Sequence, residues 1–341
     1  MDLGEGVDVV TLRASGATGI GSLPGEDVRE WCRIVAGELP VVPHLPELPQ
    51  RGPGAEMIGR TLALAVQVDA GFAAETTVSG WRIAPRLSGT TAVLRRAASW
   101  LREDLDAAEE TWSTHNGWFK IQVAGPLTLA AAVESSVGER LVADTGAVRE
   151  VGGVLAEALV AHVREVRSRL PRVGLIVQVD EPAAGLVLAG EIPNQSGWSR
   201  LPPVSIPEAR AVLGEVIDAI GSSGAGSVFH CCGSQAPVEL FSRAGAAAVG
   251  VDLTLPQSDE DLGVLLESGI GLFAGLDSAR EDGSMLSPLR ELLGRLGIEP
   301  AAVVDRVVLT PRCGLAGVGM DEARQQYARV ASAADEFGRK L

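Results

Sequence analysis

Short apolar runs alternate along the chain with longer stretches in which apolar residues recur every three or four positions. Runs rich in Val, Ile and Leu are typical of strands buried on both faces, and the longer stretches are typical of helices. The pattern predicts strands at 17–22, 119–124, 173–180, 227–230, 247–252, 271–277 and 305–311. It predicts helices at 25–37, 54–69, 90–112, 142–170, 206–221, 235–244, 258–268, 286–296 and 321–339.

This alternation of strands and helices predicts parallel strands joined by right-handed crossovers. With roughly eight such units, we expect an α/β protein with a single (β/α)₈ TIM barrel, in one domain over residues 1–341. A doubly wound open sheet is the alternative. The first predicted strand is not followed by a G-x-G-x-x-G motif, which weakens a dinucleotide-binding version of that sheet. Residues 40–55 contain five prolines and are expected to form an irregular loop over the barrel mouth.

Charge and cysteine content narrow the class of protein. The net charge of −15 disfavours nucleic acid and anionic membranes as partners. No apolar run reaches the roughly 18 residues that a membrane helix needs, and the first residues carry acids where a signal peptide carries positive charge. The four cysteines form no disulfide framework. We therefore expect a cytoplasmic enzyme whose thiols are metal ligands or buried residues.

The strongest candidate chemistry follows the predicted strand at 227–230. His230 and Cys232 are two residues apart, so on an extended segment their side chains point the same way, and Cys231 faces away. Cys313 follows another apolar strand, and the ends of barrel strands meet at one mouth. One histidine and two thiolates favour Zn²⁺, with Asp252 as a candidate fourth ligand. The alternative is that these residues belong to an ordinary core, where Cys and His are common.

Two further segments offer polar groups at strand ends. Asp180 could bind a substrate ammonium, while Glu181 caps or orients; alternatively, Asp180 is simply the N-cap of a helix. Glycine-rich residues 19–21, with the Ser22 hydroxyl and backbone N–H groups, could hold a carboxylate. Such turns are common, so the second segment alone is a weak signal.

Together these segments resemble the cobalamin-independent methionine synthase family, specifically its C-terminal catalytic barrel. The matching stretches are IGSLP at 20–24, VAGPLTL at 123–129, VQVDEPA at 177–183, HCC at 230–232 and RCGL at 312–315. The resemblance implies a (β/α)₈ barrel that binds zinc and methylates homocysteine to give methionine. It implies that the zinc ligands are His230, Cys232 and Cys313, and that the acceptor is contacted by Ile20, Gly21, Ser22 and Asp180.

The chain departs from the family at several positions. Asp252 stands near the place of the family's last metal ligand, a glutamate, and Glu56 is the residue available for a family glutamate that binds the substrate amine. Asp277 lies where the family has a proton-donating histidine, so we take Asp180 and Asp277 as candidate catalytic residues. The family's tryptophan after its GPxT segment is replaced by residues 129–132, LAAA.

The family's folate-using enzymes also have a second, N-terminal barrel, which we do not find in this chain. We therefore expect the acceptor half of the site to be retained, and the methyl donor to be a methylated corrinoid, free or protein-bound, in place of methyl-tetrahydrofolate. Two alternatives stay open. One is a corrinoid-dependent methyltransferase of the uroporphyrinogen decarboxylase-like superfamily that acts on another thiol. The other is a non-catalytic homologue that binds zinc or an amino acid.

Overall fold

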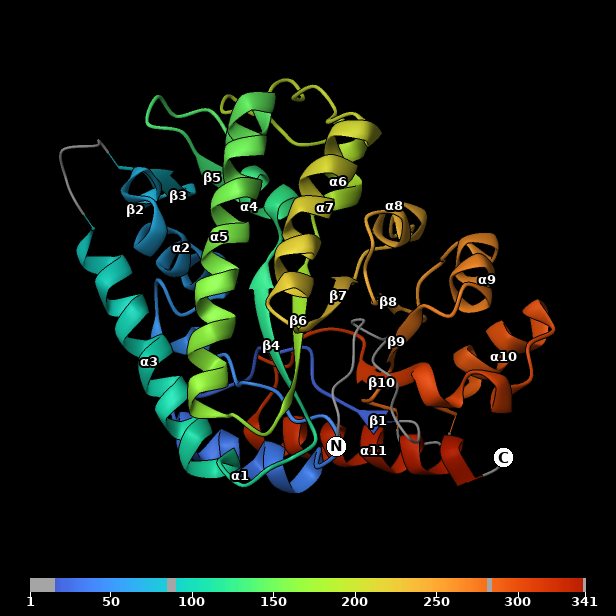
Figure 1. Ribbon diagram of the computed structural model, residues 1–341. Coiled ribbons are helices and arrows are strands. Elements are labelled where there is room, and N and C mark those ends of the chain that lie inside the picture. The colour runs from blue at the N-terminus through green and yellow to red at the C-terminus, as the bar shows by residue number, and fades with distance from the viewer. Residues whose placement is uncertain (1–15, 85–89, 281–283, 340–341) are drawn as a thin grey trace.

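The main sheet of the protein has seven parallel strands. The computed structural model describes residues 16–84, 90–280 and 284–339 (Figure 1). The strands of this sheet are β1 (Gly16–Ala17), β4 (Trp118–Ala124), β6 (Gly174–Asp180), β7 (Gly226–Cys231), β8 (Ala248–Asp252), β9 (Gly271–Leu276) and β10 (Val307–Pro311). They lie in the order β1-β10-β9-β8-β7-β6-β4. The predicted parallel arrangement is therefore confirmed, although the first strand is only two residues long.

Helices lie around the outside of the curled sheet (Figure 1). They are α1 (Val28–Glu38), α2 (Met57–Val68), α3 (Ala92–Trp112), α4 (Pro126–Ala132), α5 (Thr145–Arg169), α6 (Ala184–Ala189), α7 (Ile206–Ser222), α8 (Val238–Arg243), α9 (Asp259–Glu267), α10 (Ser287–Leu296) and α11 (Met320–Arg339). Each predicted helix is present among the described residues, and the short helices α4 and α6 were not predicted. None of the helices described is long and apolar enough to cross a membrane.

Polar side chains define where several helices begin. Asp27, Thr91, Asp144, Ser205 and Ser258 accept hydrogen bonds from backbone N–H groups in the first turns of α1, α3, α5, α7 and α9. These caps satisfy donors that a helix leaves unpaired at its N-terminus. A smaller sheet of β2 (Ala74–Thr77), β3 (Gly80–Ile83) and β5 (Val133–Glu134) lies beside α4 (Figure 1).

Residues 42–47 lie between the two edge strands of the main sheet. On one side, Leu45 N donates to Lys120 O of β4 at 2.8 Å. On the other side, Glu47 N donates to Gly21 O at 3.1 Å, in the segment that follows β1. The expectation of a loop over the mouth is therefore wrong for this segment. Pro43 and Pro46 lack N–H groups, so the segment pairs only at intervals and forms no regular strand.

The predicted barrel thus takes the form of a curled seven-stranded parallel sheet, with an irregular segment between its edge strands. One layer of the inner face is apolar. This cluster is separate from the outer core and contains Val42, Ile176, Val228, Ala248, Phe273 and Val308. Side chains two positions further along a strand point to the same face. On β6, β7 and β10 those positions are Gln178, His230 and Thr310. The inner face therefore becomes polar towards the carboxyl ends of the strands.

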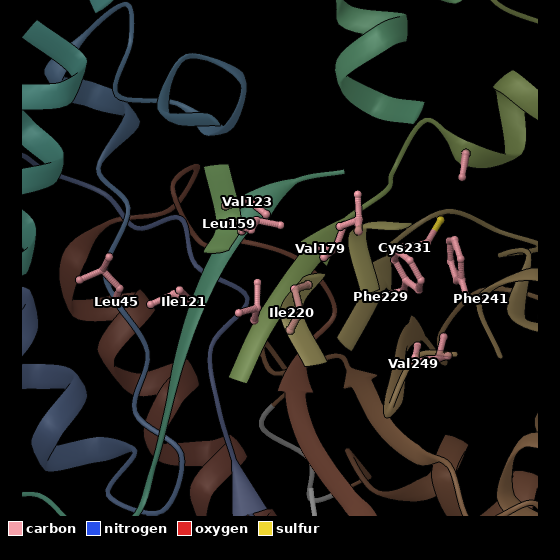
Figure 2. Close-up of a cluster of buried hydrophobic side chains, with 14 of the residues drawn as sticks. Leu45, Ile121, Val123, Leu159, Val179, Ile220, Phe229, Cys231, Phe241 and Val249 are labelled. Carbon is pink, nitrogen blue, oxygen red and sulfur yellow. The ribbon is translucent and has the colours of Figure 1, made fainter. Parts of the chain in front are cut away.

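The outer face of the sheet packs against the helices in the larger core (Figure 2). Cys231 lies in this core beside Phe229 and Phe241, whose rings stack with centroids 4.7 Å apart. It is 2% exposed. The expectation that Cys231 faces away from His230 and packs as an apolar residue is therefore confirmed.

Candidate functional site

Asp180 and His230 form the centre of the polar inner face. They are paired residues of the neighbouring strands β6 and β7, and His230 Nδ1 lies 2.7 Å from Asp180 Oδ1. Gln178 Nε2 donates to the same carboxylate oxygen at 2.8 Å. Because the carboxylate accepts, Nδ1 of His230 carries a hydrogen, and in the neutral imidazole Nε2 then has the lone pair that a metal needs. A carboxylate that orients a histidine in this way is the usual partner of a metal-binding imidazole.

Cys232 and Cys313 are direct neighbours although 81 positions separate them in the sequence. Hydrogen bonding to the Cys232 thiol lowers the pKa of the exposed Cys313 thiol, and the nearby His230 lowers it further when its imidazole is charged. The same hydrogen bond and burial raise the pKa of Cys232. The fold therefore brings both predicted thiol ligands beside the predicted histidine. Within the described residues, no three His, Cys, Asp or Glu side chains already converge as a metal-binding group.

The two other predicted acids lie at the same edge of the sheet. Asp252 ends β8, and its Oδ1 accepts hydrogen bonds from the N–H of Thr254 at 2.8 Å and from the Thr254 hydroxyl at 2.6 Å. Asp277 directly follows β9 and lines a cavity of about 330 Å³ together with Leu253 and Thr254. Asp252 is thus engaged in a local turn, whereas Asp277 borders open space.

Residues 20–22 present backbone donors that the described chain does not use. The N–H groups of Ile20, Gly21 and Ser22 donate no hydrogen bond to any described residue. Backbone N–H groups without a partner in the chain are available to bind a carboxylate or water. Ser22 also lies against Gly314, where an added Cβ would come within 1.9 Å of Ser22 Oγ. These donors are therefore held next to Cys313.

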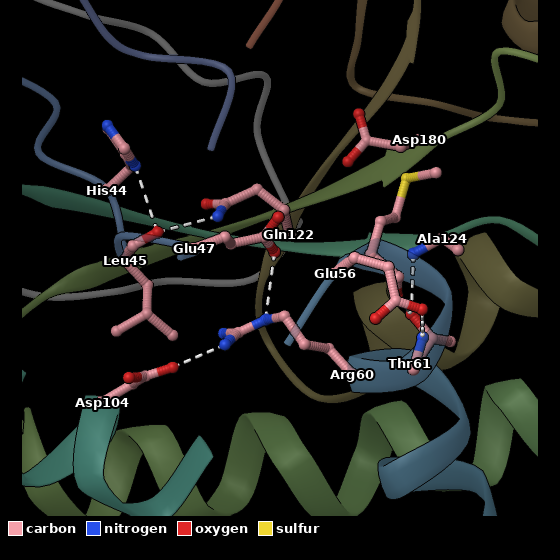
Figure 3. Close-up of polar contacts among 12 residues, drawn as sticks. His44, Leu45, Glu47, Glu56, Arg60, Thr61, Asp104, Gln122, Ala124 and Asp180 are labelled. Carbon is pink, nitrogen blue, oxygen red and sulfur yellow. Dashed lines mark hydrogen bonds and ion pairs between the residues drawn. The ribbon is translucent and has the colours of Figure 1, made fainter. Parts of the chain in front are cut away.

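Glu47 joins the site from the segment between the edge strands (Figure 3). It is 5% exposed and lies 3.4 Å from Arg60 Nε, and Asp104 in turn binds Arg60. Burial raises the pKa of Glu47 to about 7; Arg60 opposes the shift and Asp180 adds to it. A second carboxyl group thus lies near Asp180, a feature not expected from the sequence.

Glu56 has a structural role where a substrate contact was expected. It caps α2 by accepting from Gly59 N at 3.0 Å, and it also accepts from Gly54 N at 2.9 Å and from the Trp81 indole at 2.6 Å. Figure 3 shows it beside Thr61, on the helix that also carries Arg60. Its carboxylate oxygens are therefore already occupied.

Glu181 also has a structural role. It accepts hydrogen bonds from Leu127 N, Thr128 N and Thr128 Oγ1 at 2.7–2.9 Å, at the start of α4. Gly125 leaves room for it, because a Cβ there would come within 2.3 Å of Glu181 Oε1. The glutamate and the GPLT turn are thus parts of one packing unit behind Asp180.

Lys120 and Gln122 are inner-face residues that the sequence reasoning missed. Lys120 is fully buried, and its Nζ donates to Ile20 O at 3.0 Å and to Gln122 Oε1 at 3.2 Å. Burial lowers the pKa of Lys120 to about 7, while the nearby Asp180 and Glu47 oppose the shift. The signal was present in the alternation of Lys120, Gln122 and, on the next strand, Gln178 within otherwise apolar runs.

The chain is similar in fold to solved enzymes. A B12-independent methionine synthase from Shewanella sp. W3-18-1, in complex with selenomethionine, has a TM-score of 0.56 and 13% identity, over 96% of this chain and 99% of that chain. A beta-1,4-D-mannanase from Cryptopygus antarcticus has a TM-score of 0.45 and 13% identity, over 94% and 93%. A putative lyase/mutase from Burkholderia cenocepacia J2315 has a TM-score of 0.38 and 12% identity, over 97% and 85%.

At 13% identity, the likeness to the Shewanella enzyme is a likeness in fold alone. The two matches with TM-scores below 0.5 carry no argument about function. No protein-family model matches the chain, and the comparison with curated proteins gave no match.

Proposed function

We propose that this protein is a zinc-dependent methyltransferase that methylates the thiol of homocysteine to give methionine. The observation that carries the proposal is the hydrogen bond between Asp180 and His230, beside the neighbouring thiols of Cys232 and Cys313. The fold shared with the Shewanella methionine synthase supports it. We also propose that residues 42–47 take the place of the eighth strand of a closed barrel, since they hydrogen-bond to both edges of the sheet.

The donor set suits zinc in its chemistry. One imidazole nitrogen and two thiolates are borderline-soft ligands, and three protein ligands leave a position for a substrate. His230, Cys232 and Cys313 would hold the ion, which requires loss of the thiol protons and a turn of the side chains towards one centre. Bound zinc would lower the pKa of the acceptor thiol, so that a thiolate is available at neutral pH to attack the methyl carbon.

The remaining polar groups suit the amino acid part of homocysteine. The unused N–H groups of residues 20–22, with the Ser22 hydroxyl, would bind the carboxylate. Asp180 would bind the ammonium through Oδ2, because the hydrogen bonds from Gln178 and His230 occupy Oδ1. Glu47 would provide a second carboxylate for the ammonium. These residues orient the acceptor so that its sulfur lies next to the thiol ligands.

The donor in this proposal is a methylated corrinoid. Two sequence features support this donor. Residues 129–132 have no aromatic side chain after the GPLT turn, and Asp277 stands where the methionine synthase family that the chain resembles has a histidine. The cavity that Asp277 lines with Leu253 and Thr254 would be the space for a donor group. The Shewanella enzyme is B12-independent, which argues against a corrinoid donor. Methylcobalamin and methyl-tetrahydrofolate are therefore tested side by side.

The test is formation of methionine from homocysteine by the zinc-loaded protein, with methylcobalamin and with methyl-tetrahydrofolate in parallel reactions. Methionine from methylcobalamin alone supports the whole proposal. Methionine from the folate alone keeps the acceptor assignment and overturns the donor. Absence of methionine with both donors, or turnover of 2-mercaptoethanesulfonate in preference to homocysteine, contradicts the proposed acceptor chemistry.

A further inference from the structure

The amide nitrogen of Gln178 connects two parts of the candidate acceptor site. Gln178 Nε2 lies 2.9 Å from Ile20 O and 2.8 Å from Asp180 Oδ1. An amide NH₂ group has two hydrogens, so both are used in these two bonds. One side chain thus joins the segment with unused backbone donors to the carboxylate that orients His230.

The carbonyl of Ile20 is held from two strands. Lys120 Nζ, on β4, donates to the same oxygen that Gln178, on β6, contacts. Because the peptide bond is trans, the N–H of Gly21 points away from these two donors. The side chain of Gln122 packs closely against Gly21, since a Cβ at Gly21 would come within 2.8 Å of Gln122 Nε2. The direction of the free N–H group is therefore determined by buried side chains beneath it.

The carboxylate of Asp180 is held in a similar way. Its Oδ1 accepts from both Gln178 and His230, and this leaves Oδ2 without a donor among the described residues. Two bonds to one oxygen set the plane of the carboxylate and so the direction of Oδ2. Gln178 is 1% exposed, so water does not compete for its amide.

We propose that Gln178 is a positioning residue that sets the carboxylate-binding and amine-binding parts of the acceptor site in register, with Lys120 as a second anchor for the first part. This inference rests on the proposed function. The two parts are ordered before the acceptor binds, so binding does not have to order them, and affinity rises. Gln178 itself touches neither the acceptor nor the methyl group.

The experiment compares Gln178→Met with a matched control, Gln326→Met. Gln326 is a buried glutamine of α11 that bonds to Ser278 and Glu322, outside the site. Calorimetry on the zinc-loaded proteins gives the affinities for homocysteine and for 1-propanethiol, which has neither the amine nor the carboxylate. We expect Gln178→Met to weaken homocysteine binding about tenfold or more, with zinc content and 1-propanethiol affinity unchanged. The control should bind both thiols as the parent does.

If Gln178→Met does not fold, a second variant tests whether the hydrogen bonds to the Ile20 carbonyl position the carboxylate-binding part of the site. Lys120→Met removes the two hydrogen bonds to Ile20 and Gln122, together with a charge that lies near Asp180 and Glu47. It should therefore weaken binding of homocysteine and 4-mercaptobutanoate, and it should not weaken binding of 3-aminopropanethiol, which has no carboxylate and is relieved of a nearby positive charge. Unchanged homocysteine affinity in Gln178→Met, or equal losses for all four thiols, overturns the inference. Failure of the parent protein to bind zinc or homocysteine is a different result, which overturns the proposed function itself.

Discussion

His230 Nδ1 and Asp180 Oδ1 lie 2.7 Å apart on paired positions of adjacent parallel strands. This contact engages one imidazole nitrogen and one carboxylate oxygen, and it leaves Nε2 of His230 and Oδ2 of Asp180 for other partners. The two proposed roles, metal binding at 230–232 and amine binding at 180, would therefore share one hydrogen bond, although the sequence places them in separate motifs.

Asp180→Asn separates these two roles. The Oδ1 atom of asparagine can still accept from His230, so zinc should stay bound at the same stoichiometry. The NH₂ group that replaces Oδ2 cannot pair with an ammonium, so homocysteine affinity should fall by about 10- to 100-fold. Metal analysis and calorimetry check both parts. Unchanged affinity for homocysteine refutes the role of Asp180 in amine binding.

The adjacent cysteines provide an internal control for the metal. Cys232→Ala and Cys313→Ala should each lose zinc and activity together, because each removes one of three ligands. Cys231→Ala should keep zinc and activity, since its thiol lies in the outer core, and should lose about 1 kcal/mol of stability. The measurement is zinc per chain after dialysis against a weak chelator. Stoichiometric zinc in the Cys313→Ala protein would contradict the ligand assignment.

Homocysteine binding should depend on pH through Glu47. Its pKa is raised to about 7, so the carboxyl group is protonated at pH 5.5 and ionised at pH 8.5. Only the ionised form attracts an ammonium, so the affinity for homocysteine relative to 4-mercaptobutanoate should rise as pH rises through about 7. The ratio of the two affinities cancels the titration of the thiol, which both ligands share. In Glu47→Gln the rise should be smaller than in the parent, because only the loss of the nearby Lys120 charge, whose pKa is also about 7, remains. A rise as large as in the parent rules Glu47 out.

The packing of Glu181 against Gly125 should be visible in stability. Gly125→Ala places a methyl group where the carboxylate now lies, and the expected loss is about 1–3 kcal/mol of unfolding free energy. Gly185→Ala is the matched control: it lies in α6 with nothing within 4 Å of its added Cβ, so it should be neutral or stabilising by about 0.5–1 kcal/mol. Urea denaturation of both variants measures the difference. Equal stabilities would show that the loop yields without cost.

The pattern of apolar residues predicted secondary structure well where burial on both faces of a strand was the main constraint. Runs of Val, Ile and Leu predicted the strands that carry Asp180 and His230, because parallel strands are buried on both faces. Residues 42–47 were misassigned because two prolines remove backbone donors and hide the alternation of Val42 and His44. Their place between the edge strands depends on long-range pairing with β4, which no local pattern records.

The polar part of the inner face was the main omission. Lys120 and Gln178 lie inside runs that are apolar on average, and their hydrogen bonds to Ile20 join residues 100 and 158 positions apart in the sequence. The alternation of side chains along a strand could have predicted that both residues lie on the inner face of the sheet. It could not have predicted their contacts with Ile20. Glu56, the carboxylate predicted to bind the substrate amine, caps a helix, while Glu47, nine positions earlier, lies near Asp180.

The most direct test of the central claim is X-ray absorption at the zinc edge on the loaded protein, with and without homocysteine. The account predicts one nitrogen and two sulfur ligands from His230, Cys232 and Cys313, and an additional sulfur ligand when homocysteine is added. Zinc that fails to bind, or a spectrum with only nitrogen and oxygen ligands, would contradict the proposed site. A zinc spectrum that homocysteine leaves unchanged would contradict the proposed acceptor.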